Sequence, residues 1–219
     1  MDLSLYQKMI GANNTSLSQA YINDTIAHQN EFFKDSPSLK TVLVNHTQMD
    51  CIVSHTKKST KLELLFRPKS VLGKGMYINY KSDVYLITEF IPNEIYPKAT
   101  IELCNSVLKW KDETGNIKEH RCVVKRDTYN EKEDRQVNTS DSELLAIVQY
   151  NDDTKRIKPT QRFMFGSSVY EIIKFDDVSN VYNEDGYIKF GLKFTNMSTT
   201  DDVENQVADN SGNSGWGGW

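Results

Sequence analysis

The sequence contains a weak internal repeat, and this repeat limits what the chain can fold into. Two segments align without gaps at an offset of 85 residues, and each has the pattern of a strand, a short polar turn and a second strand. The matched residues are Ile78, Tyr80, Ser82, Val84, Tyr85, Ile87 and Phe90 in the first segment, and Phe163, Phe165, Ser167, Val169, Tyr170, Ile172 and Phe175 in the second. One hairpin cannot bury its apolar face alone. We therefore expect a duplicated β module, with Tyr85 and Tyr170 both facing a core.

Short apolar runs separated by polar turns surround both hairpins, which is typical of small antiparallel sheets. We predict a mainly β protein with two small antiparallel β-barrel-like modules, at residues 42–126 and 143–196. Residues 99–110 are expected to form one long strand. Residues 127–142 are expected to be a charged linker or loop, because the run 130–135 contains no apolar residue.

An N-terminal helical segment is predicted over residues 1–41. The stretch 17–34 contains neither Gly nor Pro, and Pro37 disfavours helical geometry just beyond it. Ile22, Ile26 and Phe33 fall on one face at helical spacing, so they are candidate assembly contacts. The helix either packs on its own β module or docks on a neighbouring subunit.

The last segment, residues 197–219, is acidic and rich in Gly and Ser, and we expect a flexible tail. Trp216 and Trp219 are large aromatic residues in this otherwise polar segment, and they are further candidate assembly contacts. Large aromatic rings favour a partner surface over water, so the two rings would dock into a pocket on this subunit or a neighbour. The alternative is a disordered end.

No arrangement of residues in the sequence indicates catalysis. Serines lack a nucleophile-elbow context, and Cys51, Cys104 and Cys122 show no metal-binding spacing, so we expect free, partly buried thiols. A metal site formed by Cys104, Cys122 and His120 is conceivable but disfavoured. We therefore expect no enzyme activity, no bound metal and no cofactor.

The charge balance bears on partners. The formal net charge is −4, from 26 basic and 30 acidic residues, which argues against duplex nucleic acid as a main ligand. No apolar run approaches the roughly 20 residues of a membrane helix, and no secretory signal is expected at the N-terminus. Binding of single-stranded nucleic acid would need exposed aromatic rings, and the alternative is that these rings fill two cores. The rings in question are those of Tyr77, Tyr80, Tyr85, Phe90 and Trp110.

The segment from Gly73 to Trp110 resembles structural proteins of tailed phages that infect Gram-positive bacteria. Its pattern is Gly-x-Gly-x-Tyr-Ile-x-Tyr, a turn, Val-Tyr-Leu-Ile, then Ile-Tyr-Pro-Lys-Ala and Leu-Cys-Asn-x-x-Leu-Lys-Trp. It is similar to the small β-barrel core of head–tail connector proteins, the stopper or head-closure proteins of the neck. The second module, with Gln161–Phe165 and Val169–Ile172, is similar to a pattern of the same class of virion proteins.

This resemblance implies a virion protein that is assembled in the host cytoplasm. It would form a homo-oligomeric ring of roughly six or twelve copies at the head–tail junction, between portal or adaptor and tail proteins. DNA would pass through the channel without specific binding, and no membrane would be involved. The alternatives are a tail component of the virion, or a soluble β-barrel module that binds single-stranded nucleic acid or a host protein.

Overall fold

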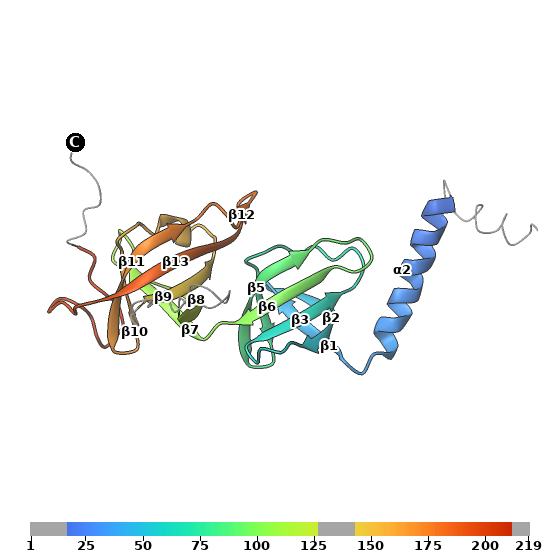
Figure 1. The fold of residues 1–219 in the computed structure, drawn as a ribbon, viewed down its shortest axis with the longest axis horizontal. Coiled ribbons are helices and arrows are strands. Elements are labelled where there is room, and N and C mark those ends of the chain that lie inside the picture. Colours follow the sequence, from blue (N-terminus) through green and yellow to red (C-terminus); the bar gives the residue numbers. More distant parts are fainter. Residues whose placement is uncertain (1–16, 127–142, 212–219) are drawn as a thin grey trace, which may run out of the picture.

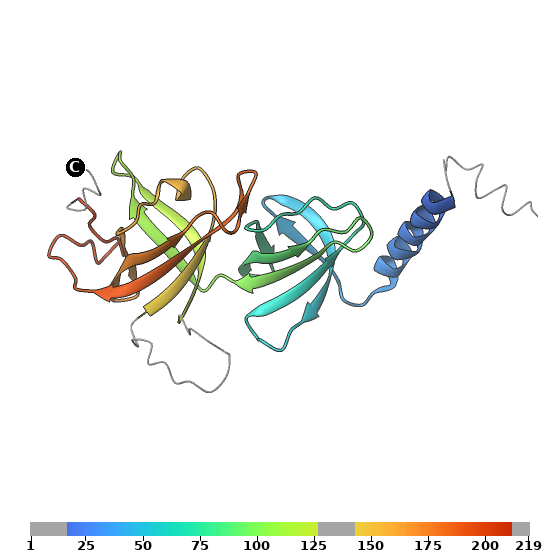
Figure 2. The same cartoon turned by 45° about the horizontal axis from the view of Figure 1, so that its top comes forward.

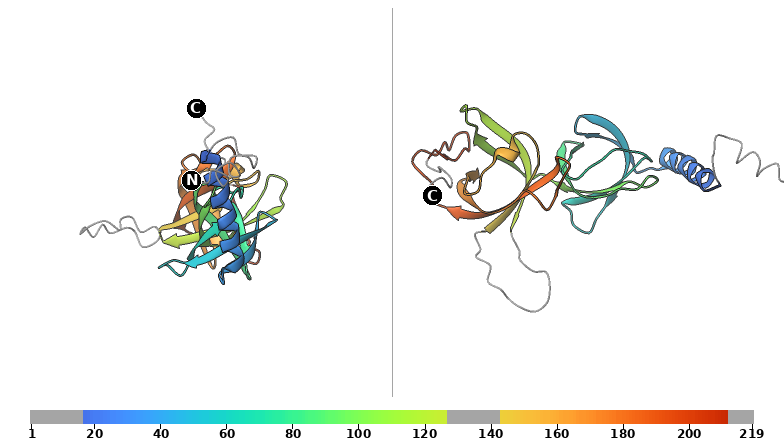
Figure 3. Two further views of the ribbon diagram at one scale, coloured as in Figure 1. Left: turned by 90° about the vertical axis from the view of Figure 1, so that its right-hand side faces the viewer. Right: turned by 90° about the horizontal axis from the view of Figure 1, so that it is seen from above.

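The structure is a computed structural model that describes residues 17–126 and 143–211. It shows two β-barrels side by side, with one helix beyond the first barrel (Figure 1). Helix, first barrel and second barrel follow one another along the long axis, as the turned views also show (Figures 2 and 3). The predicted fold class, mainly β with two barrel-like modules and an N-terminal helix, is confirmed.

Helix α2 (Leu17–Asp35) ends two residues before Pro37, as the sequence predicts. Its C-terminal end meets the first barrel. There, Phe33 is fully buried and the Arg67 guanidinium lies 5.2 Å from the centre of its ring. One turn earlier, the Gln29 amide donates to the Tyr96 hydroxyl at 3.3 Å.

The first barrel is a closed antiparallel sheet with the strand order β1-β2-β3-β6-β5-β4. Its strands are β1 (Leu39–Val44), β2 (Thr47–His55), β3 (Lys61–Phe66), β4 (Tyr77–Tyr80), β5 (Asp83–Ile91) and β6 (Lys98–Leu103). The core consists of alternate residues of these strands, as a pleated sheet requires. Leu64, Phe66, Ile78, Ile87 and Ile101 are all fully buried there.

The second barrel has the strand order β10-β11-β13-β9-β8-β7. Its elements are β7 (Ser106–Lys111), β8 (Ile117–Arg126), β9 (Glu143–Gln149), η1 (Thr154–Arg156), β10 (Arg162–Phe165), β11 (Ser168–Asp176), the short β12 (Val181–Tyr182) and β13 (Asp185–Thr195). When the six long strands of each barrel are numbered in chain order, both barrels have the order 1-2-3-6-5-4. One difference concerns closure. Hydrogen bonds join β1 to β4, whereas no ladder joins the equivalent β7 and β10 among the described strands.

The two hairpins that repeat in the sequence are equivalent in the structure. Ile78 is paired with Tyr85, and Phe163 is paired with Tyr170, so the register is the same. The first residue of each turn, Lys81 or Gly166, has a positive φ (56° and 63°). A register shift follows Ile87 in β5 and follows Ile172, 85 residues later, in β11.

The aromatic packing of these hairpins is repeated as well. Tyr80 and Tyr85 have ring centroids 6.5 Å apart, and the equivalent Phe165 and Tyr170 have centroids 6.0 Å apart. Tyr85 packs against the core of the first barrel and Tyr170 against the core of the second. The prediction that both tyrosines face a core is therefore confirmed, and the two hairpins agree with the predicted duplication.

The predicted border between the modules is wrong. β7 and β8 pair with each other and then with β9, so residues 106–126 belong to the second barrel and not to a module at 42–126. The expected long strand 99–110 is two strands of different barrels, separated at Cys104 and Asn105. The charged stretch 127–142 lies outside the described residues, and it connects β8 to β9 within one barrel rather than linking two modules.

A buried contact joins the two barrels. Leu86 of the first barrel packs with Val123, Ile147 and Tyr187 of the second, and these residues form an apolar cluster of their own. The Tyr77 hydroxyl donates across the contact to the carbonyl oxygen of Arg121.

Charged groups reinforce the same contact. The Glu102 carboxylate, whose side chain is 7% exposed, bridges Lys61 of the first barrel at 3.6 Å and Lys125 of the second at 3.3 Å. The backbones of Gly75 and Gly186 also meet in this contact. They approach so closely that a Cβ atom on Gly75 would lie 1.6 Å from the Gly186 oxygen.

Candidate assembly sites

A cleft of about 480 Å³ lies at the end of the second barrel beside β7, the strand that is unpaired with β10. Its walls come from the β7–β8 hairpin, from the loop after η1 and from the residues that follow β13. Side chains that shape it include Trp110, Lys118, Asp153, Arg156, Lys158 and Asp202. Both acidic and basic groups line the walls, so the cleft does not select a ligand of one charge.

One cleft wall is supported by a histidine–carboxylate pair. His120 Nε2 lies 3.3 Å from one oxygen of Asp153, and Lys118 Nζ lies 3.0 Å from the other. Burial lowers the pKa of His120, although the Asp153 carboxylate acts in the opposite direction. The imidazole is stacked on Trp110 with centroids 5.4 Å apart, and its Nδ1 lies 3.3 Å from Asn151 Nδ2.

The chemistry of this pair is limited. A base and an orienting carboxylate are present, but nucleophilic catalysis also needs a hydroxyl or thiol within hydrogen-bond reach. Across residues 17–126 and 143–211, no Ser, Thr or Cys side chain is hydrogen-bonded to His120. Sequence analysis missed the pair because its members are separated by 33 residues, with His120 in strand β8 and Asp153 just before η1.

The three cysteines lie in three different environments. Cys51 belongs to the first core and Cys122 to the second, while Cys104 lies in the contact between the barrels. All three are buried and unpaired, and burial raises the pKa of each thiol to about 12. Such thiols stay protonated near neutral pH and are poor nucleophiles. Within the described part of the chain, no group of three metal-ligating side chains is brought together.

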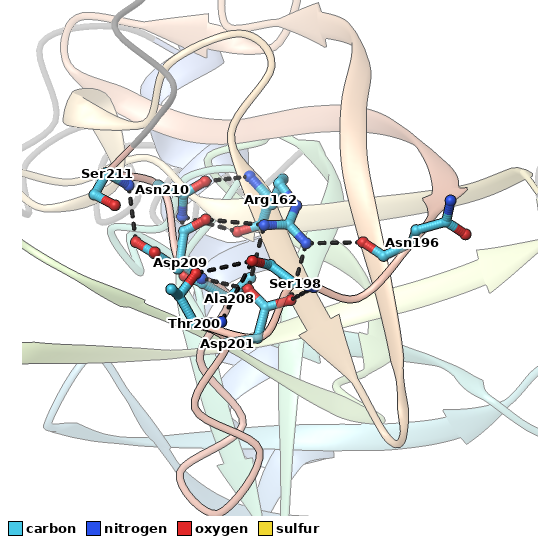
Figure 4. Close-up of polar contacts among 9 residues, drawn as sticks. All are labelled: Arg162, Asn196, Ser198, Thr200, Asp201, Ala208, Asp209, Asn210 and Ser211. Atoms are coloured by element: carbon cyan, nitrogen blue, oxygen red, sulfur yellow. Dashed lines mark hydrogen bonds and ion pairs between the residues drawn. The ribbon is translucent and has the colours of Figure 1, made fainter.

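Arg162 of β10 anchors the C-terminal segment, which we define as residues 196–211, to the second barrel (Figure 4). Its guanidinium donates to both carboxylate oxygens of Asp201, at 3.2 and 2.9 Å. It also donates to the carbonyl oxygens of Asn196 and Asp209, at 2.9 and 3.0 Å. The side chain of Asp201 is 0% exposed, and it accepts further bonds from the backbone N–H groups of Ser198 and Asp209.

A second contact fixes the end of the C-terminal segment to the same strand. The Asn210 side chain accepts from the backbone N–H of Arg162 at 2.7 Å and donates to its carbonyl oxygen at 3.1 Å. It thereby satisfies the edge of β10 as a neighbouring strand would. Ala208 packs against Met164 and Val169 beside this contact.

These contacts correct the expectation of a flexible tail from residue 197 onward. Residues 197–211 are packed on the second barrel, because the buried Arg162–Asp201 pair and Asn210 hold them there. The polar composition of the segment concealed this, since its carboxylates and amides satisfy one another and β10. Trp216 and Trp219, the candidate contacts of the tail, lie outside the described residues.

The helical candidates occupy different environments. Phe33 is buried against the first barrel, and Ile22 and Ile26 are partly buried. Tyr21 and Phe32, which were not among the candidates, are 64% and 51% exposed. The structure therefore assigns Phe33 to the fold and leaves other apolar side chains of α2 accessible.

The aromatic rings that single-stranded nucleic acid would need are used in packing. Trp110 lies in the second core, and Tyr77 lies in the contact between the barrels. Tyr80, Tyr85 and Phe90 pack against the first core. The alternative prediction, that the rings fill the cores, fits these positions.

The fold defines a class of protein: a duplicated two-barrel β protein whose barrels are joined through a buried contact. Residues 10–103 match the YomX N-terminal domain, and residues 106–193 match the YomX C-terminal domain. The border between the two matches coincides with the link between the barrels. The chain therefore carries both YomX domains, in that order, one on each barrel. Both are phage-derived families, and the chain is a phage protein.

Other comparisons add little. No curated protein matches the chain significantly. An ATP-binding sugar transporter-like protein from Salmonella typhimurium is 15% identical, with a TM-score of 0.31, over 40% of this chain and 99% of that one. YcgR in complex with c-di-GMP from Escherichia coli is 12% identical, with a TM-score of 0.21, over 83% of this chain and 85% of that one. At these scores neither likeness supports an argument about function.

Among the described residues, no helix combines the length and the apolar character needed to cross a bilayer.

Proposed function

We propose that this phage protein is a structural component of the virion, which forms a ring at the head–tail junction and connects portal to tail. In this role it acts through surfaces, and not as an enzyme. Copies of the chain and the neighbouring portal, adaptor and tail proteins are its partners. DNA passes through the ring without specific binding, in keeping with the net charge of −4.

The observation that carries the proposal is helix α2. It extends away from the first barrel at one end of the molecule, and the C-terminal segment lies at the other end (Figure 1). Tyr21 and Phe32 leave apolar surface on the helix, and such surface on an element outside the cores favours a protein partner. A ring needs two different complementary surfaces on each subunit, and the two ends of this molecule differ in that way.

Labelling of whole virions with an antibody against this chain tests the proposal. Label at the head–tail junction supports it, and label at the distal tail tip favours a tail component instead. Absence of the chain from purified virions, measured by mass spectrometry, contradicts a structural role.

A variant tests the part of α2. Tyr21→Ala combined with Phe32→Ala should lower incorporation into virions at least several-fold, while the unfolding midpoint of the purified chain stays unchanged. Val178→Ala is the matched control, since Val178 is 77% exposed and belongs to the second barrel. Equal incorporation of both variants would show that α2 is not the assembly element.

A further inference from the structure

The duplication places two equivalent hairpin faces in one chain. In the first hairpin, Tyr77 pairs with Leu86 and Asn79 with Val84, and these side chains point out of the barrel. At the 85-residue offset, Arg162 pairs with Glu171 and Met164 with Val169. We call the second set, formed by these four residues, the β10–β11 outer face.

The outer face of the first hairpin is a docking surface within this chain. Tyr77, Val84 and Leu86 pack in the apolar cluster that joins the barrels, and Leu86 is fully buried there. The first barrel therefore binds the second barrel through this face.

The β10–β11 outer face has a different occupant. The C-terminal segment covers it, with Ala208 packed on Met164 and Val169 and with Asp201 paired to Arg162. Ala208 is 3% exposed and Val207 is 2% exposed, so the segment buries apolar surface as a docked element does. The second barrel covers the outer face of the first hairpin, and the C-terminal segment covers the equivalent face of the second hairpin.

We propose that the C-terminal segment is a releasable cap over an assembly face, and that the uncapped β10–β11 outer face binds a second copy of this chain. The cap is suited to release because it is a short segment with no strand of its own in the sheet, held by Arg162, Asn210 and Ala208. This inference goes beyond the proposed assembly role, because a two-fold contact joins two copies and not the neighbours around a ring, and its test uses the purified full chain. Its failure is therefore distinguishable from absence of the chain from virions.

The chemistry of the face favours a second copy as the occupant. Arg162 and Glu171 lie opposite each other across the hairpin, with the apolar Met164 and Val169 one pair further along. A two-fold axis through such a face would bring Arg162 of one copy to Glu171 of the other, and would join the apolar pairs. Two-fold contacts require this kind of self-complementary surface.

Release of the cap can be tested with a substitution on the cap itself. Ala208→Glu puts a carboxylate against Met164 and Val169, and should raise hydrogen exchange of residues 196–211 at least tenfold. The same variant should form dimers in a concentration-dependent manner in analytical ultracentrifugation, while the wild-type chain stays monomeric. Gln206→Glu is the matched control, because it adds the same charge at an exposed position of the same segment and should leave both measurements unchanged.

A second substitution locates the contact. Glu171→Arg added to Ala208→Glu places like charges across the two-fold contact and should return the chain to monomers. Asn210→Ala, which removes only the two hydrogen bonds to the β10 edge, is a milder release and should shift exchange and dimerisation in the same direction. An uncapped chain that stays monomeric overturns the proposal, as does a dimer that is insensitive to Glu171→Arg. So does a wild-type chain whose cap exchanges as fast as that of the variant.

Discussion

At the scale of single residues, the buried pair of Arg162 and Asp201 has a clear energetic role. Taking both charges out of water is costly, so the pair stabilises the fold only because every oxygen of Asp201 has a donor. Loss of one member leaves the other charge buried without compensation. The pair therefore matters more for what its disruption costs than for its own net contribution.

Substitution of the arginine tests this asymmetry. Arg162→Ala should lower the free energy of unfolding by up to about 3–5 kcal/mol, which is the cost of leaving Asp201 buried without its partner. Release of the C-terminal segment brings Asp201 into water and limits that cost. Lys98→Ala is the control: it breaks the pair of Lys98 and Glu63 at 2.7 Å, both of which are about two-fifths exposed, and should cost about 0–1 kcal/mol. Urea denaturation of both variants measures the difference, and equal costs would contradict the buried-pair argument.

The carboxylates of the C-terminal segment also make a prediction about pH. Hydrogen bonds lower the pKa of Asp209 from 3.8 to about 2. The largest effect comes from the Thr200 side chain and the next from the backbone N–H of Ser211. Burial alone would raise the pKa of Asp201, but the N–H groups of Asp209 and Ser198 and the Arg162 guanidinium outweigh it and lower that pKa too. A depressed carboxylate pKa contributes stability above the unfolded value, and this stability is lost as the pH falls through the folded value.

The stability that ionised Asp209 contributes is therefore lost as the pH falls from about 4 to about 2. Asp209→Asn should show a smaller loss of unfolding free energy than the wild-type chain across this window, measured by urea denaturation at stepped pH. Glu204→Gln, which changes an exposed carboxylate of the same segment, is the control. If the free energy of unfolding of the Asp209→Asn chain falls with pH as steeply as that of the wild-type chain, Asp209 is not a source of the acid sensitivity.

At the scale of elements, α2 combines a buried anchor with an exposed neighbour. Phe33→Ala should cost about 3 kcal/mol, because a fully buried phenylalanine leaves a cavity between the helix and the first barrel. It should also raise hydrogen exchange in the last turns of α2. Phe32→Ala, at the adjacent and half-exposed position, should change stability by less than about 0.5 kcal/mol. Reversed or equal effects would show that the helix packs through its other face.

The sequence was sufficient for elements whose information is local. The hairpin at β10–β11 could be predicted together with its register, because the alternation of apolar residues and the 85-residue offset are both present in the amino-acid sequence. The end of α2 could be predicted because Pro37 acts on the residue before it. The class of fold followed from the same local patterns.

Elements that depend on distant partners could not be assigned. Nothing in β7 and β8 indicates which sheet they join, because pairing with β9 is decided by residues across the undescribed stretch 127–142. The packing of the C-terminal segment could not be predicted for the same reason, since Asp201 is separated from its partner Arg162 by 39 residues of sequence. A polar composition predicts exposure to solvent. It does not reveal that a polar group is hydrogen-bonded to residues that are distant in the sequence.

At the scale of the whole molecule, the contact between the barrels decides whether the chain acts as one body. Gly75 and Gly186 approach so closely that no side chain fits between them, and the Leu86 cluster and Glu102 lie in the same contact. A connector subunit would need this rigidity to hold its two ends at a fixed distance. The two glycines give a direct way to open the contact.

Gly75→Ala should destabilise the chain by about 2–4 kcal/mol, from the positive φ of 81° together with the collision of the new Cβ atom with the Gly186 carbonyl. Gly115→Ala separates the two causes, because Gly115 has nearly the same φ of 84° and nothing within 4 Å of its would-be Cβ atom. It should therefore cost only about 1 kcal/mol. Small-angle scattering should also show a longer or more variable particle for Gly75→Ala but not for Gly115→Ala. If both variants lose the same stability and keep the same dimensions, the barrels do not depend on this approach, and the rigid body must be maintained by the apolar cluster alone.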